Sequence, residues 1–154
     1  MLLEWVSANF THIFRRYSAG VINVTRPIWG QHLILDLAKC PRNLLVNEYH
    51  LRCWVKELVA AIDMVSYGEP QLEHFAAHSF EAAGYTLLQL IETSNICAHF
   101  AENLGQVYID IFSCKSFDND TAESVCSKYF EPQVIERHLI DRGAFESLPA
   151  RAAG

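Results

Sequence analysis

Three short apolar segments follow one another in the middle of the chain and constrain its fold more than any other feature. "YTLLQLIE" (85–92), "NICAHF" (95–100) and "QVYIDIFSC" (106–114) carry the aliphatic and aromatic residues that favour strands. Only short polar connections separate them, and residues 103–105 have the composition of a hairpin turn. Consecutive strands joined so closely pair as antiparallel neighbours, so this region predicts an antiparallel sheet.

Further elements flank these strands. The segments 31–40 and 133–140 are two more strand candidates, and the Asp/Asn-rich start of segment 118–130 predicts a helix there. Asn47 is a plausible N-cap for another helix that ends near Gly68. Its apolar stripe consists of Leu51, Trp54, Val55, Leu58, Ile62 and Val65. This order of elements predicts an α+β fold, a two-layer sandwich of a mainly antiparallel sheet with helices on one face.

The small number of helices leaves one face of the predicted sheet uncovered. Several strands are apolar on both alternations, so that face requires a partner, and we expect a homodimer. Residues 1–28 form an N-terminal extension with helical apolar spacing, residues 29–142 the domain, and residues 143–154 a C-terminal tail. We expect this extension to pack on the domain; the alternative is a helix that binds a partner or a membrane surface.

The composition excludes several classes of function. A chain of 154 residues with a net charge of −6 is one domain without the basic surface that nucleic acid requires. No apolar run is long enough to cross a bilayer, and the first segment has the wrong charge order for a signal peptide. Five widely spaced cysteines without a C-x-x-C pair indicate free thiols in a reducing compartment. We therefore expect a cytoplasmic protein with neither nucleic-acid nor membrane partners.

Two groups of reactive residues remain. His74 and His78 would share one face of a helix at metal-ligand spacing, but no H-E-x-x-H pattern or third ligand accompanies them. We therefore expect packed or surface histidines and no metal. Ser94 and His99 lie in the middle segment, where Ser94 lacks the G-x-S-x-G elbow of hydrolases. Cys114 ends the next strand, where a side chain can reach a pocket, although cysteine is more often a small buried residue.

Four motifs then show a resemblance. "GQHLILDLAKC", "HSFEAAGYT", "TSNICAHFAEN" and "YIDIFSC" occur in the order and spacing found in the small prokaryotic S-adenosylmethionine decarboxylases. The chain resembles this family over its central domain. The intervals from Ser94 to His99, five residues, and from His99 to Cys114, fifteen residues, equal those of the family.

The resemblance implies a mechanism. The hydroxyl of Ser94 would attack the carbonyl of Thr93, cleave the chain there and leave a pyruvoyl group as a self-made cofactor. That group condenses with the amine of the substrate and serves as an electron sink for decarboxylation. His99 matches the proton carrier of the cleavage, and Thr86 matches a supporting hydroxyl. Cys114 matches the thiol that protonates the substrate's α-carbon after CO₂ leaves.

The chain departs from the family at two positions. The family has glutamate where Thr93 stands, and a β-branched residue alters the backbone at the bond to be cleaved. The family also binds the ribose hydroxyls with a glutamate four residues after the histidine. Here that position is Asn103, and the carboxylate is shifted to Glu102, which turns it to the other face of a strand. Phe80 matches the aromatic residue that stacks on adenine.

Three functional hypotheses follow. The first is a pyruvoyl-dependent S-adenosylmethionine decarboxylase that supplies the aminopropyl donor for spermidine, with Glu102 or Asn103 at the ribose. The second is the same chemistry on another amino acid, ornithine or arginine, if no residue replaces the ribose contact. The third is an unprocessed homologue without catalysis that acts as a partner or regulatory subunit.

Overall fold

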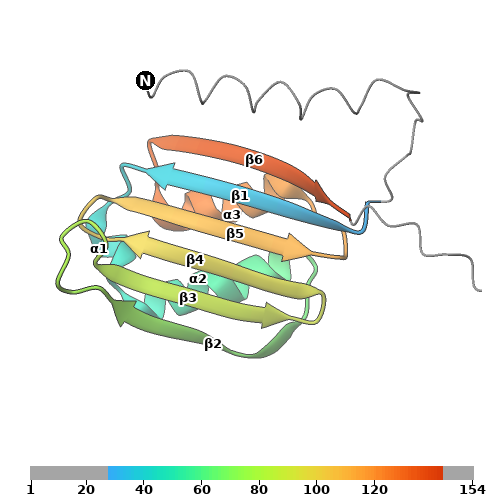
Figure 1. The fold of residues 1–154 in the computed structure, drawn as a ribbon, viewed down its shortest axis with the longest axis horizontal. Coiled ribbons are helices and arrows are strands. Elements are labelled where there is room, and N and C mark those ends of the chain that lie inside the picture. Colours follow the sequence, from blue (N-terminus) through green and yellow to red (C-terminus); the bar gives the residue numbers. More distant parts are fainter. Residues whose placement is uncertain (1–27, 144–154) are drawn as a thin grey trace, which may run out of the picture.

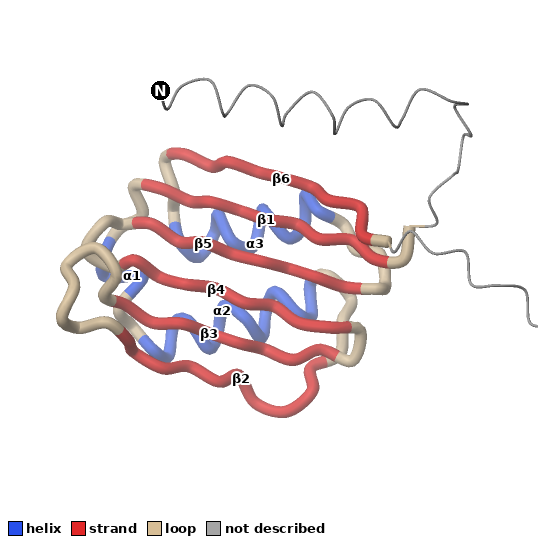
Figure 2. Tube along the Cα trace, viewed as in Figure 1, coloured by secondary structure: helices blue, strands red, loops and turns tan. Residues whose placement is uncertain are grey.

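A single six-stranded sheet forms the framework of the molecule. The computed structural model describes residues 28–143, and helices cover one face of the sheet while the other stays open (Figures 1 and 2). All neighbouring strands are antiparallel, in the order β2-β3-β4-β5-β1-β6. The strands are β1 (Gly30–Ala38), β2 (Ser66–Phe75), β3 (Gly84–Ile91), β4 (Ser94–Ala101), β5 (Gln106–Ser113) and β6 (Val134–Arg142). The helices are α1 (Arg42–Leu45), α2 (Glu48–Ala61) and α3 (Asn119–Phe130). The predicted α+β architecture is confirmed.

The core lies between the two long helices and the sheet. Trp54 of α2 and Phe130 of α3 both contact Phe100 of β4, with ring centroids 5.7 and 5.5 Å apart. All three side chains are fully buried, and burial of such large rings provides much of the stability of a domain of this size. The predicted N-caps are also confirmed: Asn47 accepts a hydrogen bond from the His50 N–H at 3.1 Å, and Asp118 caps α3.

The prediction was wrong between the first helix and the central strands. Helix α2 ends at Ala61 rather than near Gly68, because Asp63 takes a left-handed conformation with φ of 55°. Val65 therefore lies outside the helix and is exposed. The short helix α1 was also not predicted.

Strand β2 was missed because it contains Gly68 and Pro70, which argue against a strand. It is an edge strand whose register shifts between Tyr67 and Gln71, and both residue types are tolerated at such irregular edges. His74 consequently lies on a strand and His78 in the loop that follows. The expectation that these two histidines share a helix face was wrong.

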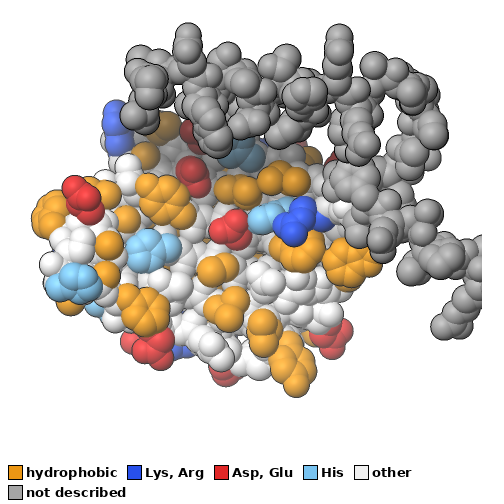
Figure 3. All heavy atoms as spheres, viewed as in Figure 1, with side chains coloured by type: hydrophobic (Ala, Val, Ile, Leu, Met, Phe, Trp, Pro, Cys, Tyr) orange, Lys and Arg blue, Asp and Glu red, His pale blue; other side chains and the backbone are white. Residues whose placement is uncertain are grey.

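The uncovered face, here called the open face, bears many exposed apolar side chains (Figure 3). The strand register assigns to it the exposed residues Tyr67, Phe75, Leu90, Tyr108, Val134 and Ile140. Within residues 28–143 this face is uncovered and partly apolar, as predicted, whereas the homodimer stays a prediction. The predicted N-terminal helix and C-terminal tail fall on residues 1–27 and 144–154, outside the described part of the chain. Within residues 28–143, every helix is too short or too polar to cross a membrane.

Candidate active site

Ser94 begins strand β4 in a strained backbone conformation. It begins β4 directly after the two-residue turn formed by Glu92 and Thr93. Its φ is 151°, a region that glycine occupies readily and other residues rarely. Such a conformation costs about 1–3 kcal/mol and persists only where the surrounding structure enforces it. The side chain is half-buried, and its Oγ accepts a hydrogen bond from Asn95 Nδ2 at 3.2 Å, which leaves the hydroxyl proton of Ser94 free to be removed.

The carbonyl group before Ser94 is polarised by its neighbour in the sheet. Ser94 pairs with Ser113 at the end of β5, so the next residue, Cys114, reaches back across the turn. Its backbone N–H donates to the carbonyl oxygen of Thr93 at 3.1 Å. A donor in this position stabilises negative charge that develops on the oxygen when a nucleophile attacks the carbonyl carbon. The exposed thiol of Cys114 follows directly, so the structure brings Ser94 and Cys114 together as predicted.

The side chain of Thr93 is also held in place. Its Oγ1 accepts a hydrogen bond from Ser113 Oγ at 2.9 Å and donates to the sulfur of Met64 at 3.1 Å. On the far side of Ser113, Lys115 makes an ion pair with Asp63 at 2.6 Å, which lowers the pKa of that carboxyl group. Sequence reasoning missed these partners. Ser113 stands in the "YIDIFSC" motif and could have been noticed, whereas nothing in the sequence pointed to Met64.

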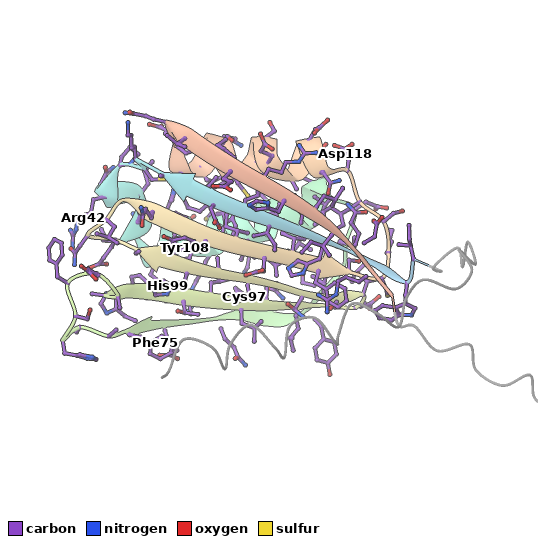
Figure 4. All side chains as sticks on the ribbon, turned by 45° about the horizontal axis from the view of Figure 1, so that its top comes forward. Arg42, Phe75, Cys97, His99, Tyr108 and Asp118 are labelled. Carbon is purple, nitrogen blue, oxygen red and sulfur yellow. The ribbon has the colours of Figure 1, made fainter. Side chains whose placement is uncertain are left out.

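Thr86 and His99 form a second group, on the open face. They are directly paired across β3 and β4, and Thr86 Oγ1 lies 2.9 Å from His99 Nδ1. Two residues that the family resemblance singled out separately therefore lie in direct contact. Figure 4 labels His99 near Tyr108, its partner on β5, and Cys97 further along β4. Burial, and secondarily the charge of Asp110, raise the pKa of Cys97, so this thiol stays protonated near neutral pH.

The two groups are too far apart to react within one chain. Ser94 and His99 lie on the same extended strand five residues apart, which places their Cα atoms roughly 16 Å from each other. No rotation of the two side chains closes this distance. His99 can therefore reach a Ser94 side chain only if that serine belongs to another molecule.

The three remaining predicted residues gather at the opposite end of β4. Asn103 donates from Nδ2 to the backbone carbonyl of Phe80 at 3.0 Å, and the Phe80 ring is exposed. Glu102 is buried, and both of its carboxylate oxygens are engaged, one by Arg42 at 3.1 Å and the other by His74 at 3.3 Å. Figure 4 labels Arg42 at this end of the molecule.

Glu102 lies eight positions after Ser94, just beyond the end of β4, which corresponds to about 26 Å of extended chain. The predicted substrate-binding residues of one chain therefore do not share a site with the reactive serine of that chain. The carboxylate of Glu102, moreover, is occupied by groups of its own chain.

A polar network not foreseen from the sequence lies on the open face near Cys114. Arg142 donates to His32 Nδ1 at 3.1 Å, so the His32 proton resides on Nε2, which donates to Asp110 at 2.9 Å. The Arg142 guanidinium also stacks over the Phe112 ring, 4.8 Å from its centroid. His32 and Asp110 belong to two of the motifs that carry the family resemblance, which was the available signal.

Two depressions adjoin this network. One, of about 510 Å³, is lined by Trp29, Phe112, Arg142 and Gly143. The other, of about 370 Å³, is lined by Ile28, Trp29, Gly30, Gln31, Cys114, Ser116 and Asp141. The second of these depressions provides space for a small molecule beside Cys114. Among residues 28–143, His, Cys, Asp and Glu side chains do not assemble into any group of three that could hold a metal ion.

Comparison with known proteins finds relatives that match most of the chain. The family model of S-adenosylmethionine decarboxylase matches residues 31–143. An S-adenosylmethionine decarboxylase proenzyme of Archaeoglobus fulgidus is 26% identical over 117 residues, which are 75% of this chain and 99% of that protein. One of Parasynechococcus marenigrum is 28% identical over 80% of this chain and 90% of its own length.

A further proenzyme of the same name, from Clostridium botulinum strain Langeland, is 31% identical over 73% of this chain and 97% of its own length. The crystal structure of the adenosylmethionine decarboxylase from Aquifex aeolicus superposes with a TM-score of 0.65, covering 80% of this chain and 98% of that one. Its sequence identity is 18%, so this last likeness concerns the fold.

Proposed function

Because the chain belongs to the S-adenosylmethionine decarboxylase family, we propose that it is a self-cleaving decarboxylase whose cofactor is a pyruvoyl group made from Ser94. The observation that carries this proposal is the geometry of one peptide bond. The serine after that bond is held in a strained conformation, and the carbonyl before it is polarised by the Cys114 N–H. Strain that relaxes on reaction and a donor aimed at the developing charge both favour attack by the hydroxyl.

The cleavage proceeds in three balanced steps. Ser94 Oγ bonds to the carbonyl carbon of Thr93 while the peptide nitrogen takes a proton and leaves, so the amide becomes an ester. Loss of the Ser94 α-proton then expels the carboxylate of Thr93 and leaves a dehydroalanine. Addition of water and loss of ammonia give the pyruvoyl group at the start of the new chain. The masses of the two chains together equal that of the precursor plus water minus ammonia.

The residues around Ser94 suit such a group. The pyruvoyl carbonyl supplies an electron sink for the charge left when CO₂ departs. Cys114 stands next to that position with an exposed thiol, and a depression large enough for a small molecule opens beside it. We assign Cys114 the delivery of a proton to the substrate carbon after decarboxylation.

The proposal includes a homodimer in which two open faces meet. A proton carrier must lie within hydrogen-bond reach of the group it serves, and His99 of the same chain does not. A second copy across the open face supplies His99, Thr86 and Phe80 to the first copy's Ser94. The exposed apolar residues of that face provide the buried area that such an interface requires.

S-adenosylmethionine is the first candidate substrate, and its decarboxylated form would serve spermidine synthesis. One observation favours a second candidate, a basic amino acid such as ornithine or arginine. The carboxylate of Glu102 is bound by Arg42 and His74 and is not free to hold the hydroxyls of a ribose. Asn103 is the remaining polar side chain at that turn, and it contacts the Phe80 backbone.

Release of CO₂ from carboxyl-labelled S-adenosylmethionine, ornithine and arginine tests the activity and separates the substrates. Release from one of the three, lost in Ser94→Ala, supports the proposal. Absence of release from all three, with an uncleaved chain, favours the alternative of a non-catalytic partner or regulatory subunit.

Co-expression of two differently tagged variants tests the shared site. Ser94→Ala lacks the nucleophile and His99→Ala lacks the proton carrier, so neither is cleaved alone. In a mixed dimer one site combines Ser94 of the second variant with His99 of the first, and only the His99→Ala chain is cleaved. A mixture in which both chains stay intact would remove the shared site from the proposal.

A further inference from the structure

We propose that the hydroxyl group of Thr93 is a positioning group for the self-cleavage, held by Ser113 and Met64. The inference rests on the proposed function and concerns how the scissile carbonyl is oriented. It assigns a role to Thr93, which stands where the family motif has glutamate. The hydroxyl of Thr93 does not react itself; it acts through the geometry of the peptide group that is attacked.

Three consecutive hydrogen bonds define the arrangement. The Lys115 N–H donates to Ser113 Oγ at 3.0 Å, Ser113 Oγ donates to Thr93 Oγ1 at 2.9 Å, and Thr93 Oγ1 donates to Met64 Sδ at 3.1 Å. The Lys115 N–H occupies one lone pair of Ser113 Oγ, and each of the two hydroxyl protons has an acceptor within this chain of bonds. Ser113 is fully buried, which makes its bond to Thr93 costly to exchange for water.

The chain of bonds and the polarised carbonyl hold Thr93 from two sides. Ser113 holds the side chain, and the next residue, Cys114, holds the carbonyl oxygen at 3.1 Å. Rotation about χ1 is restricted in a β-branched side chain, so anchoring Oγ1 also restrains the backbone of Thr93. The peptide plane between Thr93 and Ser94 is therefore restrained on both sides, which is the condition under which the strained φ of Ser94 persists.

This restraint acts on the first step of the cleavage. Attack by Ser94 Oγ requires a defined approach to the carbonyl carbon, and small displacements of reacting groups slow such reactions strongly. Loss of the Thr93 hydroxyl therefore slows formation of the ester. It does not slow the later elimination, because by then the amide bond that the hydroxyl orients has already been broken.

The variant Thr93→Val removes the hydroxyl and keeps the shape of the side chain. Ser113 Oγ lies 3.8 Å from Met64 Sδ and can turn its proton to that sulfur, so no buried donor is stranded. Thr93→Ser restores the hydroxyl, and Ser113→Ala removes the anchor without changing Thr93. Thr121→Val makes the same substitution at a half-buried threonine of α3, away from the cleavage turn, and is the matched control.

The experiment follows cleavage of freshly synthesised full-length chain over time, with and without hydroxylamine, which splits esters. We expect Thr93→Val and Ser113→Ala to be cleaved at least about tenfold more slowly than the unmodified chain. Hydroxylamine should not accelerate them, because the ester does not accumulate. Thr93→Ser and Thr121→Val should be cleaved at nearly the normal rate, and all four variants should unfold cooperatively in urea.

Normal cleavage of Thr93→Val would overturn the positioning role, and so would hydroxylamine-sensitive ester accumulating in that variant. Slow cleavage of Thr93→Ser would show that shape rather than the hydroxyl matters, which also contradicts it. If the unmodified chain itself stays intact, the proposed function fails first and the positioning role fails with it.

Discussion

The two turns at the ends of β4 both contain a residue with positive φ, but the residue type differs between them. Each turn reverses the chain between antiparallel strands, and each involves one residue with positive φ. At the β4–β5 turn that residue is Gly105, with φ of 63°, where an added Cβ would lie 2.8 Å from the carbonyl oxygen of Cys40. At the β3–β4 turn it is Ser94, with φ of 151°.

Under the proposed function, the β4–β5 turn with Gly105 contributes to stability, whereas the β3–β4 turn with Ser94 contributes to the cleavage. Glycine adopts positive φ without steric strain, so its use at position 105 serves the fold. Serine at position 94 retains a strain of about 1–3 kcal/mol, which is explained if the hydroxyl is needed there. The β4–β5 turn also contains the carboxylate of Glu102, which Arg42 and His74 hold in place through ion pairs.

Replacement of the serine should produce the largest effect. Ser94→Ala removes the only oxygen that can attack the Thr93 carbonyl from this position, so cleavage and decarboxylation should both be abolished. The fold should remain, because the side chain makes one hydrogen bond, to Asn95. Gel analysis and CO₂ release measure the two outcomes. Fragments from Ser94→Ala would mean that another residue cleaves the chain, and the contrast between the turns would lose its chemical meaning.

Replacement of the neighbouring thiol should separate cleavage from turnover. Cys114→Ala keeps the backbone N–H that polarises the Thr93 carbonyl, so cleavage should continue at nearly the normal rate. Turnover should fall by about a hundredfold or more because the proton donor is lost. The measurement compares the fraction cleaved with the rate of CO₂ release and with the structure of the amine product. Unchanged turnover would remove this role from Cys114.

A substitution in the β4–β5 turn should change the stability of the protein but not its cleavage. Gly105→Ala introduces a Cβ at positive φ against the Cys40 carbonyl, and it should lower the free energy of unfolding by about 2 kcal/mol. Urea unfolding measures this loss, and the fraction of chain cleaved should stay normal in the folded protein. A cleavage defect equal to that of a site variant would show that the two turns are not independent.

The backbone strain at position 94 can be measured by comparing the stabilities of two variants that cannot be cleaved. Ser94→Ala and Ser94→Gly both lack the hydroxyl, but glycine relieves the positive φ at some cost in chain entropy. Ser94→Gly should therefore be more stable than Ser94→Ala by about 1 kcal/mol in urea unfolding. Equal stability, or greater stability of the alanine variant, would mean that position 94 stores no strain.

The smallest effect concerns the ion pair beside the reactive turn. Lys115 lowers the pKa of Asp63 in the folded state, so this pair stabilises the protein above the ordinary aspartate pKa, and the contribution disappears as pH falls through the lowered value. Asp63→Asn should thus be slightly less stable near neutral pH and indistinguishable in acid. Both groups are exposed, so the difference is small and should shrink in high salt. An increased difference in acid would contradict the sign.

The sequence predicts much of the fold because local sequence patterns determine most of its helices and strands. The apolar segments of β3, β4 and β5 and the caps Asn47 and Asp118 act through near neighbours. Strand β2 was not predicted because Gly68 and Pro70 are unfavourable in strands, and their tolerance depends on an edge position that only the assembled sheet defines.

The candidate site was predicted in its parts but not in its arrangement. Ser94 and Cys114 meet because β4 and β5 pair in one particular register, and the bond from Ser113 to Thr93 depends on the same register. The separation of His99 from Ser94, in contrast, follows from the strand itself, since five extended residues already span about 16 Å. Spacing along the sequence matched a family motif without indicating that two of its residues lie too far apart in one chain to react with each other.

The most direct test is the mass of the purified full-length chain after reduction with cyanoborohydride in the presence of each candidate amino acid. The account predicts two fragments of 93 and 61 residues, the larger ending at Thr93 and the smaller carrying the reduced substrate adduct at position 94. A single unlabelled mass for all 154 residues would contradict it.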